Sequence, residues 1–263
     1  MADEEELLVG GVANAGAVTR VGDEVRRPWS EFTPSAHHFL RAVREAGFEG
    51  VPRPLPSQED GRERLSFVPG DVPIPPYPPW AQTDGALASL ATLMRQFHDA
   101  AGAVMAEGVW SGELADPQGG PIVCHNDVCL ENVVFRNGSA IALLDWDFAA
   151  PGRPVYDLAQ MARMCVPVDD DVSASRLGWV KANTPARLRL VSDAYGLAGE
   201  GRMELLSVLD DSMCSGGVFV LQRVEAGDPN FIRMWENIGG MERYDRRREW
   251  WSAVRDDFAR ALR

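Results

Sequence analysis

The feature that most constrains this chain is an apolar hairpin with polar residues at both of its ends. Residues 125–132 read H-N-D-V-C-L-E-N and lead into the apolar run 133–135, and Asp145 closes the apolar run 141–144. The Asn-Gly pair at 137–138 favours a tight turn between the two runs, because a type I′ turn needs a positive φ at both central residues. A hairpin brings its two ends together, so we expect these polar residues to share one face of the molecule.

The spacing of these polar residues, H-x-D-x-x-x-x-N followed by a strand-end Asp, is typical of kinase-type phosphoryl transfer. That chemistry needs one Asp that orients the attacking hydroxyl and accepts its proton, and we expect Asp127 to be this base. We expect Asn132 and Asp145 to be Mg²⁺ ligands, because Mg²⁺ prefers hard oxygen donors. Asp147 falls on the same side of an extended chain as Asp145 and is a candidate second metal ligand. The alternative is that these residues serve only in turns, where Asp and Asn are common.

Two following segments extend the pattern: 145–149 reads D-W-D-F-A, and 151–159 reads P-G-R-P-V-Y-D-L-A. Over residues 122–160 the chain resembles the aminoglycoside phosphotransferase and choline kinase-like family, relatives of the protein kinases. This resemblance implies an α+β, two-lobed protein-kinase-like fold with a small β-rich N-terminal lobe and a larger, mostly helical C-terminal lobe. Asn126 stands where protein kinases have Arg and no A-P-E sequence follows, which indicates a small-molecule kinase.

The resemblance also implies cofactors and supporting roles. It implies ATP, with GTP as an alternative, together with Mg²⁺. It implies that His125 supports the catalytic loop by hydrogen bonding and that Asp157 braces the loop from below. A helix N-cap is an equally natural role for Asp157. By the same resemblance, adenine would bind the backbone near Phe67 and Val68.

The phosphate-binding elements are less complete. The stretch 10–16, G-G-V-A-N-A-G, is a candidate loop over the nucleotide phosphates, in which Asn14 and Gly16 would take part. It matches no glycine-rich phosphate motif. Family kinases carry a strand Lys that pairs with the phosphates, but this chain has no Lys before residue 71. Arg26 stands where that Lys would fall, and we expect Arg27 to point to the opposite face. The alternative is that both arginines are surface charges on an edge strand.

Proline residues crowd the segment 71–80, which we interpret as the boundary between an N-terminal nucleotide-binding lobe, 1–70, and a C-terminal catalytic and substrate-binding lobe, 71–263. The N-terminal lobe is expected to hold a hairpin turning at Gly22-Asp23 and a helix over 34–46 that Thr33 caps. Further helices are expected at 84–106, 155–165, 185–196, 201–225, 229–237 and 241–262.

The composition of the chain limits the classes of partner that it can bind. The net charge of −13 disfavours nucleic acid, whose phosphates need Lys and Arg, and suits a cationic acceptor, although solubility explains acidity equally well. We expect no membrane segment, because no apolar run approaches ~18 residues. The acidic N-terminus is not that of a signal peptide, and the four cysteines form no C-x-x-C pair. We therefore expect a cytoplasmic protein with reduced thiols. The sequence does not specify the oligomeric state.

The sequence thus favours an ATP-dependent kinase that phosphorylates a hydroxyl of a small molecule. Aminoglycosides, other antibiotic alcohols, choline-like amines and sugars are all compatible acceptors, and Asp210 or Glu236 is expected to touch the acceptor. The alternative is a catalytically weak or non-catalytic relative, a pseudokinase that binds a ligand or confers immunity. The missing strand Lys favours this alternative, whereas the presence of Asp127, Asn132 and Asp145 favours the enzyme.

Overall fold

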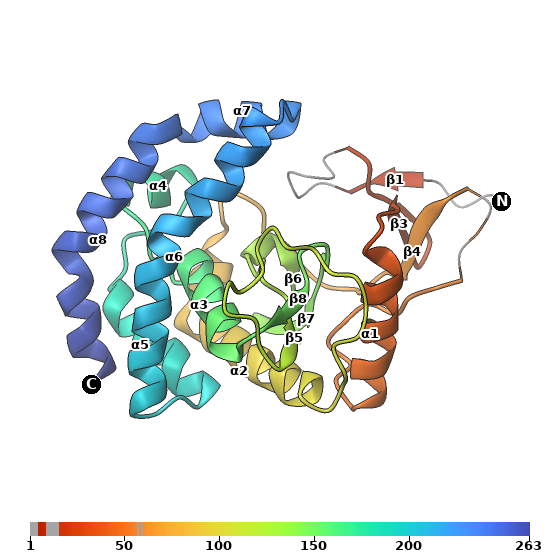
Figure 1. Cartoon of the computed structure of the whole chain (residues 1–263), viewed down its shortest axis with the longest axis horizontal. Helices are drawn as coiled ribbons and strands as arrows, with labels where there is room; N and C mark the ends of the chain where they lie inside the picture. Colours follow the sequence, from red (N-terminus) through yellow and green to blue (C-terminus); the bar gives the residue numbers. More distant parts are fainter. Residues whose placement is uncertain (1–4, 9–15, 57, 59) are drawn as a thin grey trace.

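The computed structural model describes residues 5–8, 16–56, 58 and 60–263. A small lobe built on an antiparallel sheet lies at one end, and a larger, mostly helical lobe forms the rest. Figure 1 shows the sheet lobe at the right and the C-terminal helices at the left. The expected α+β class, with a small β-rich lobe followed by a larger helical lobe, is confirmed.

Four short antiparallel strands form the sheet of the small lobe in the order β1-β2-β3-β4. Their bounds are β1 Glu5–Leu7, β2 Thr19–Val21, β3 Glu24–Pro28 and β4 Arg62–Ser66. In the β3–β4 register Arg27 lies opposite Glu63, and Arg26 lies opposite Arg64. Directly opposed residues point to the same face of a sheet and neighbours along a strand point to opposite faces. This register therefore decides which arginine faces the large lobe.

Helix α1, Thr33–Glu45, follows the sheet strand β3 and packs toward the large lobe. Pro34 lies in its first turn, and Gly47, with a φ of +100°, ends it. The expectation that Thr33 caps this helix is wrong. Phe32 occupies the cap position without a side-chain bond, and Thr33 Oγ1 accepts the Ser30 N–H at 3.0 Å instead.

The chain crosses between the lobes after β4. Phe67 N–H donates to Asp23 O at 2.8 Å, which keeps the start of the crossing against the small sheet. Asp71 then exchanges two backbone hydrogen bonds of 2.8 Å with Phe135 of the large lobe. The change of partner occurs between Phe67 and Asp71, beside the expected boundary between 1–70 and 71–263, and that division stays a proposal.

The large lobe carries two small sheets and seven α-helices among the described residues. The sheets pair β5 Ile122–Cys124 with β8 Ala150–Gly152, and β6 Val133–Arg136 with β7 Ser139–Leu143. The helices are α2 Asp84–Ala101, α3 Pro154–Cys165, α4 Asp171–Arg176, α5 Thr184–Tyr195, α6 Glu200–Glu225, α7 Pro229–Ile238 and α8 Gly240–Leu262, and two short 3₁₀ turns are η1 Pro79–Gln82 and η2 Leu130–Asn132.

The expected Asn137-Gly138 turn is confirmed between β6 and β7, with φ values of +51° and +76°. The expected helices from residue 155 onward are confirmed to within one residue at each end. The helix expected over 84–106 ends at Ala101, because Gly102 follows and the next backbone bonds are those of turns. Helix α4 was not expected. It is a short helix whose first N–H groups are accepted by Asp170.

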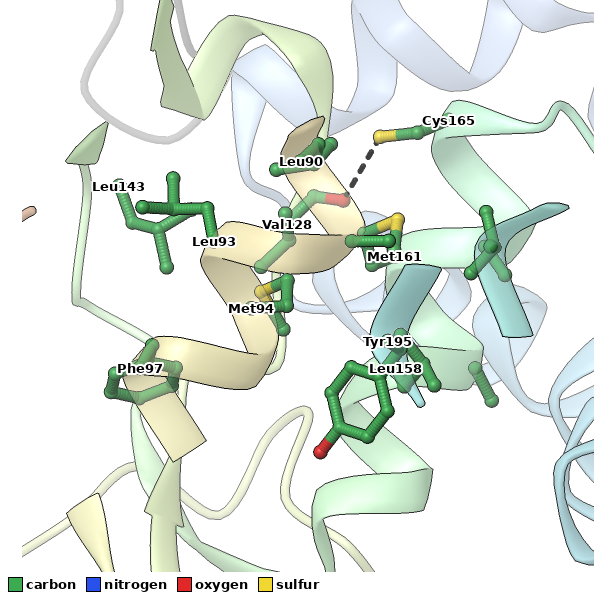
Figure 2. Packing of buried hydrophobic residues seen from close by; sticks show 14 of the residues in the cluster. Leu90, Leu93, Met94, Phe97, Val128, Leu143, Leu158, Met161, Cys165 and Tyr195 are labelled. Atoms are coloured by element: carbon green, nitrogen blue, oxygen red, sulfur yellow. Dashed lines mark hydrogen bonds between the residues drawn. The ribbon is translucent and has the colours of Figure 1, made fainter. Parts of the chain in front are cut away.

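The core of the large lobe anchors the loop between β5 and η2. Figure 2 shows the buried face of α2 packing against Val128 of this loop and against α3. Val128 is fully buried, and the Cys165 thiol donates to Val128 O at 3.6 Å. Burying a Val side chain contributes roughly 1.5–3 kcal/mol, which holds its neighbour Asp127 in place. None of the helices in the described parts of the chain is both long and apolar enough to cross a membrane.

Candidate active site

Asp127 lies on the loop that leaves β5, where its backbone and side chain are both held by neighbours. Asn132 Nδ2 donates to Asp127 O at 2.9 Å and to Asp127 Oδ2 at 3.2 Å. The residue before Asp127, Asn126, has a left-handed backbone with φ +66°, and its side chain donates to Phe148 O at 3.0 Å. A left-handed conformation at a non-glycine residue is costly and persists only where surrounding contacts impose it.

Asp157, in the first turn of α3, is one source of those contacts. It is completely buried and accepts the His125 and Asn126 backbone N–H groups, each at 2.8 Å. His98 Nε2 lies 3.0 Å from the same carboxylate. Burial alone would raise the pKa of Asp157, but the His98 contact and the two N–H groups hold it below its ordinary value. The carboxylate therefore braces the loop from below, and α3 begins at Pro154, so Asp157 is not its N-cap.

His125 joins the two ends of the hairpin. Its Nε2 lies 2.8 Å from Leu144 O, which can only accept, so Nε2 carries the proton. The other nitrogen, Nδ1, then accepts the Asp127 N–H at 3.3 Å. One imidazole thus fixes the position of Asp127 relative to Asp145, which follows Leu144. Burial lowers the pKa of His125, which favours the neutral ring that this pattern requires.

Arg27 and three carboxylates form what we call the interlobe cluster: Arg27, Glu63, Asp145 and Asp147. Arg27 Nη1 donates to Asp145 Oδ1 at 3.0 Å, Arg27 Nε lies 3.0 Å from Glu63 Oε2, and Arg27 also pairs with Asp147. The Arg27 side chain is only 8% exposed, whereas those of Asp145 and Asp147 are 31% and 30% exposed. The cluster therefore ties the small lobe to the large one and leaves its two aspartates open on one side.

The assignment of Arg26 to this position is corrected by the structure. Arg26 Nε donates to Glu24 Oε1 at 2.6 Å on the other face of the sheet, and Arg27 is the residue that reaches Asp145. The two arginines do point to opposite faces of the sheet, as expected, but Arg27 and not Arg26 is the one that points toward the site. The cation of the small lobe at this site is therefore Arg27.

The interlobe cluster is short of positive charge. Its three carboxylates face one guanidinium, and the further partner of Glu63 is His37 Nε2 at 2.9 Å. Burial, followed by the charge of Asp145, raises the pKa of Asp147 to about 6. Burial would also raise the pKa of Asp145, but Arg27 holds it below its ordinary value. The arrangement therefore favours an additional cation beside Asp145 and Asp147.

The side chains present fit a divalent metal. The amide nitrogen of Asn132 donates to Asp127. Its Oδ1 accepts no hydrogen bond from the described residues. Asp145 has a left-handed backbone with φ +60°, a strained conformation at the end of β7. One amide oxygen and one or two carboxylates are a donor set suited to Mg²⁺. Asn132, Asp145 and Asp147 are the residues that would hold it.

The carboxyl of Asp127 has the electrostatics of a general base. Burial first, and the charge of Asp145 second, raise its pKa to about 7. A base is most effective when its pKa is close to the working pH. Since the two carboxylates interact, a cation bound by Asp145 would lower this pKa toward its ordinary value.

The residues expected to bind the nucleotide are only partly placed. Asn14 lies outside the described residues, and Gly16 has a φ of +79° at the turn before β2. Phe67 and Val68 follow β4, at the crossing between the lobes, and both are half-buried. The guanidinium of Arg20 covers the Phe67 ring at 3.7 Å from its centroid. No hydrogen bond or ion pair in the described part of the chain joins Gly16, Phe67 or Val68 to the interlobe cluster.

A cavity of about 410 Å³ opens beside Asp127 on the side of the large lobe. Residues of α3, of α6 and of the loop before β5 line it, together with the loop residues 126–128. Asp211 lies at its edge. Asp210 and Glu236, the acids expected to touch an acceptor, do not line it: Asp210 pairs with Arg255 and Trp251 instead.

Several residues of the site carried no local signal in the sequence. Glu63 and His98 reach Arg27 and Asp157 from distant strands and helices. The one available signal for His98 was its place on the apolar face of α2, one turn after Met94. Arg163 of α3, which lines the cavity beside Asp127, lay in an expected helix but had no expected role.

Comparisons with known proteins agree with this geometry. The family described as the phosphotransferase enzyme family matches residues 105–206. Among curated proteins, the chain is similar to the trifolitoxin immunity protein of Rhizobium leguminosarum bv. trifolii. The two are 30% identical over 207 residues, which cover 76% of this chain and 77% of that protein.

Solved structures with the same fold include two small-molecule kinase relatives. A choline/ethanolamine kinase family protein from Mesorhizobium loti superposes with a TM-score of 0.63 and 19% identity, covering 98% of this chain and 91% of that chain. A spectinomycin phosphotransferase in complex with ADP and spectinomycin has a TM-score of 0.59 and 13% identity, covering 90% and 88%. The fold is therefore the protein-kinase-like fold of these kinases.

Proposed function

This chain belongs to the phosphotransferase enzyme family, and from that premise we propose that it is an ATP-dependent kinase that phosphorylates a hydroxyl of a small molecule. The observation that supports this most strongly is the convergence of Asp127, Asn132 and Asp145 from both ends of one hairpin. Neighbours in the fold bind ADP or GDP together with small antibiotics, which supports a nucleotide as the donor.

In this proposal Asp127 acts on the acceptor. Its carboxylate accepts a hydrogen bond from the acceptor hydroxyl and aligns the oxygen with the γ-phosphorus. As the new O–P bond forms and the bond from the γ-phosphorus to the bridging oxygen of ADP breaks, the hydroxyl proton passes to Asp127. Asn132 keeps the carboxylate oriented through its bond to Oδ2, and His125 keeps it at a fixed place relative to Asp145.

The interlobe cluster acts on the nucleotide. A Mg²⁺ ion held there would supply positive charge against the negative charge that develops on the phosphate during transfer. Asn132, Asp145 and Asp147 would hold it. Arg27 is the cation of the small lobe closest to this position, and its guanidinium suits phosphate as well as carboxylate. The crossing at Phe67 and Val68 is our proposed adenine site.

The direct test is transfer of label from γ-labelled ATP to a panel of alcohols in the presence of Mg²⁺. Wild type is expected to label at least one alcohol, and Asp127→Asn is expected to do so at least about 10²-fold more slowly. Binding of ATP by the variant, followed by thermal shift, serves as the control for folding. Equal labelling by both proteins would remove Asp127 from the mechanism.

One alternative has a specific observation behind it. The missing strand Lys, and the similarity to an immunity protein, are consistent with a pseudokinase that binds its ligand without turning it over. Such a protein would be stabilised by nucleotide or ligand but would transfer no label to any alcohol and would hydrolyse no ATP. The labelling experiment and a thermal shift, run together, separate the two functions.

A further inference from the structure

One cation that lines the cavity beside Asp127, Arg163, forms no ion pair with a carboxylate of the described residues, although Asp169 and Asp127 act on it at longer range. The other charged residues of the cavity lining are the cation Arg153 and the carboxylates Glu113, Asp127 and Asp211. Arg153 holds Asp116 through bonds of 2.7 and 3.1 Å, and Arg223, outside the cavity lining, holds Glu113 at 2.7 Å. Arg163 of α3 differs. Its only hydrogen bond among the described residues runs from Nε to Gln160 Oε1, at 3.4 Å.

Both terminal nitrogens of Arg163 are therefore left without a protein acceptor in the described part of the chain. Burial lowers the pKa of Arg163 to about 10, and Arg247 adds to this effect, although Asp169 and Asp127 act in the opposite direction. A guanidinium remains charged at that pKa, and a charge in such a position is costly unless an anion neutralises it. Arginine is also suited to planar, bidentate binding of carboxylate and phosphate groups.

We propose that this cavity binds an acceptor that carries an anionic group, a carboxylate or a phosphate, which pairs with Arg163 while a hydroxyl of the same molecule lies at Asp127. The cavity volume of about 410 Å³ is within the range of small-molecule sites. Half-buried Phe219 and Tyr156 supply apolar wall between the two polar ends. The inference rests on the proposed function, because it names the acceptor class of that site.

The place of Arg163 argues for a contact with the acceptor. The cavity is lined by Asp127 and its two neighbours, but Asn132 and the interlobe cluster lie outside the lining. Asp127 is thus where the acceptor side and the metal-binding side meet. The net charge of −13 suggested a cationic acceptor, but the lining of this cavity also holds Arg163, which has no ion pair among the described residues.

Matched pairs of alcohols test the proposal. Each pair keeps the hydroxyl and changes the charge: glycerate with glycerol, gluconate with sorbitol, pantothenate with pantothenol. Glycerol 3-phosphate distinguishes phosphate from carboxylate, and choline and kanamycin are the cationic acceptors. Each compound is tested for labelling by γ-labelled ATP and, without nucleotide, for a rise in melting temperature.

Two variants and a control assign the effect to Arg163. Arg163→Met keeps most of the side-chain volume and removes the charge. Arg163→Glu reverses the charge. Arg95→Met on α2 removes an exposed arginine that pairs with Asp99, lies 5.6 Å from the centroid of the Tyr195 ring and is outside the cavity lining, and it serves as the matched control. We expect wild type to bind and label the anionic members. In Arg163→Met, kcat/KM for these members is expected to fall roughly 10- to 100-fold, mainly through a higher KM.

Arg163→Glu is expected to shift the preference toward choline or kanamycin, and Arg95→Met is expected to resemble wild type. The inference is overturned if wild type prefers neutral or cationic members, if no anion raises its melting temperature, or if Arg163→Met keeps the anionic preference. Labelling of a cationic acceptor independently of Arg163 would refute the inference and leave the kinase proposal intact. If anions bind in a way that depends on Arg163 but no label is transferred to any acceptor, the kinase proposal is refuted and the anion-binding role of Arg163 stands.

Discussion

Two arginine–carboxylate clusters in this protein use the same groups and differ in charge balance. In the helical cluster, which we define as Asp169, Asp170, Arg243, Arg246 and Arg247, three cations meet two carboxylates. Arg247 is almost completely buried and holds Asp169 through bonds of 3.0 and 2.9 Å. In the interlobe cluster one guanidinium meets three carboxylates.

The difference shows what each cluster is for. A set of charges that only holds helices together is most stable when every carboxylate has its cation, and the helical cluster meets that condition. Among the described residues the interlobe cluster has one guanidinium for three carboxylates, and it keeps two aspartates partly open to solvent. We interpret this excess of carboxylates as the place of a metal ion, which the helical cluster, with a cation for every carboxylate, does not need.

The largest expected effect is that of Asp145→Ala. This change removes the central carboxylate of the interlobe cluster and should abolish the Mg²⁺-dependent part of ATP stabilisation, measured by thermal shift. The matched change in the helical cluster, Asp169→Ala, should lower the melting temperature of the apoprotein but keep the Mg²⁺-dependent shift. If both variants keep that shift, the metal assignment is wrong and Asp147 becomes the next candidate.

Arg27→Ala is expected to have the next largest effect. Removing the buried partner of three carboxylates should lower the free energy of unfolding by about 3–5 kcal/mol, measured with chemical denaturant. Arg26→Ala, on the other face of the same strand, should change the free energy of unfolding much less, because Arg26 is the more exposed of the two arginines. Mg²⁺ without nucleotide should recover more stability in Arg27→Ala than in wild type. Equal losses for the two variants would mean that Arg27 does not hold this cluster.

Asp127→Asn tests the proposed base and leaves both clusters unchanged. It keeps the size and the bond to Asn132, so ATP binding should stay close to wild type while kcat falls about 10²-fold or more. The measurement is steady-state turnover with the best acceptor of the labelling panel, with ATP affinity determined in parallel. A fall in affinity equal to the fall in kcat would indicate a binding role.

The smallest expected effect is the pH dependence of the helical cluster. Burial would raise the pKa of Asp169, but Arg247 and Arg243 lower it to about 2, below the ordinary value of ~3.9. A depressed pKa contributes stability above the ordinary pKa, and that stability is lost as the pH falls toward 2. Asp169→Asn should therefore lose about 2 kcal/mol relative to wild type at pH 7, and this difference should narrow between pH 4 and pH 2. A difference that is independent of pH would contradict this assignment.

The sequence predicted those parts of the molecule that local patterns determine. The β6–β7 hairpin follows from Asn137-Gly138, and the long C-terminal helices follow from apolar periodicity. The order of Asp127, Asn132 and Asp145 along the chain was sufficient to predict that they meet, because a hairpin closes over that distance.

The contacts made across the chain could not be predicted in the same way. Strand alternation separates Arg26 from Arg27, but only the pairing with β4 decides which of them faces the large lobe. His98 and Asp157 meet because α2 and α3 pack together, and no local pattern encodes that contact. That Arg163 lines the cavity beside Asp127 without an ion pair among the described residues follows from how α3 packs, and no local pattern encodes it.

The measurement that tests the central claim most directly is isothermal titration of ADP into wild type, with Mg²⁺ and with EDTA. ADP cannot be turned over, so the titration reports binding alone. The charge deficit of the interlobe cluster predicts that Mg²⁺ strengthens ADP binding by about 10-fold or more, and that Asp145→Ala binds ADP equally weakly under both conditions. Equal ADP affinity of wild type with Mg²⁺ and with EDTA would contradict the account, because three carboxylates beside one arginine would then be a purely structural contact between the lobes.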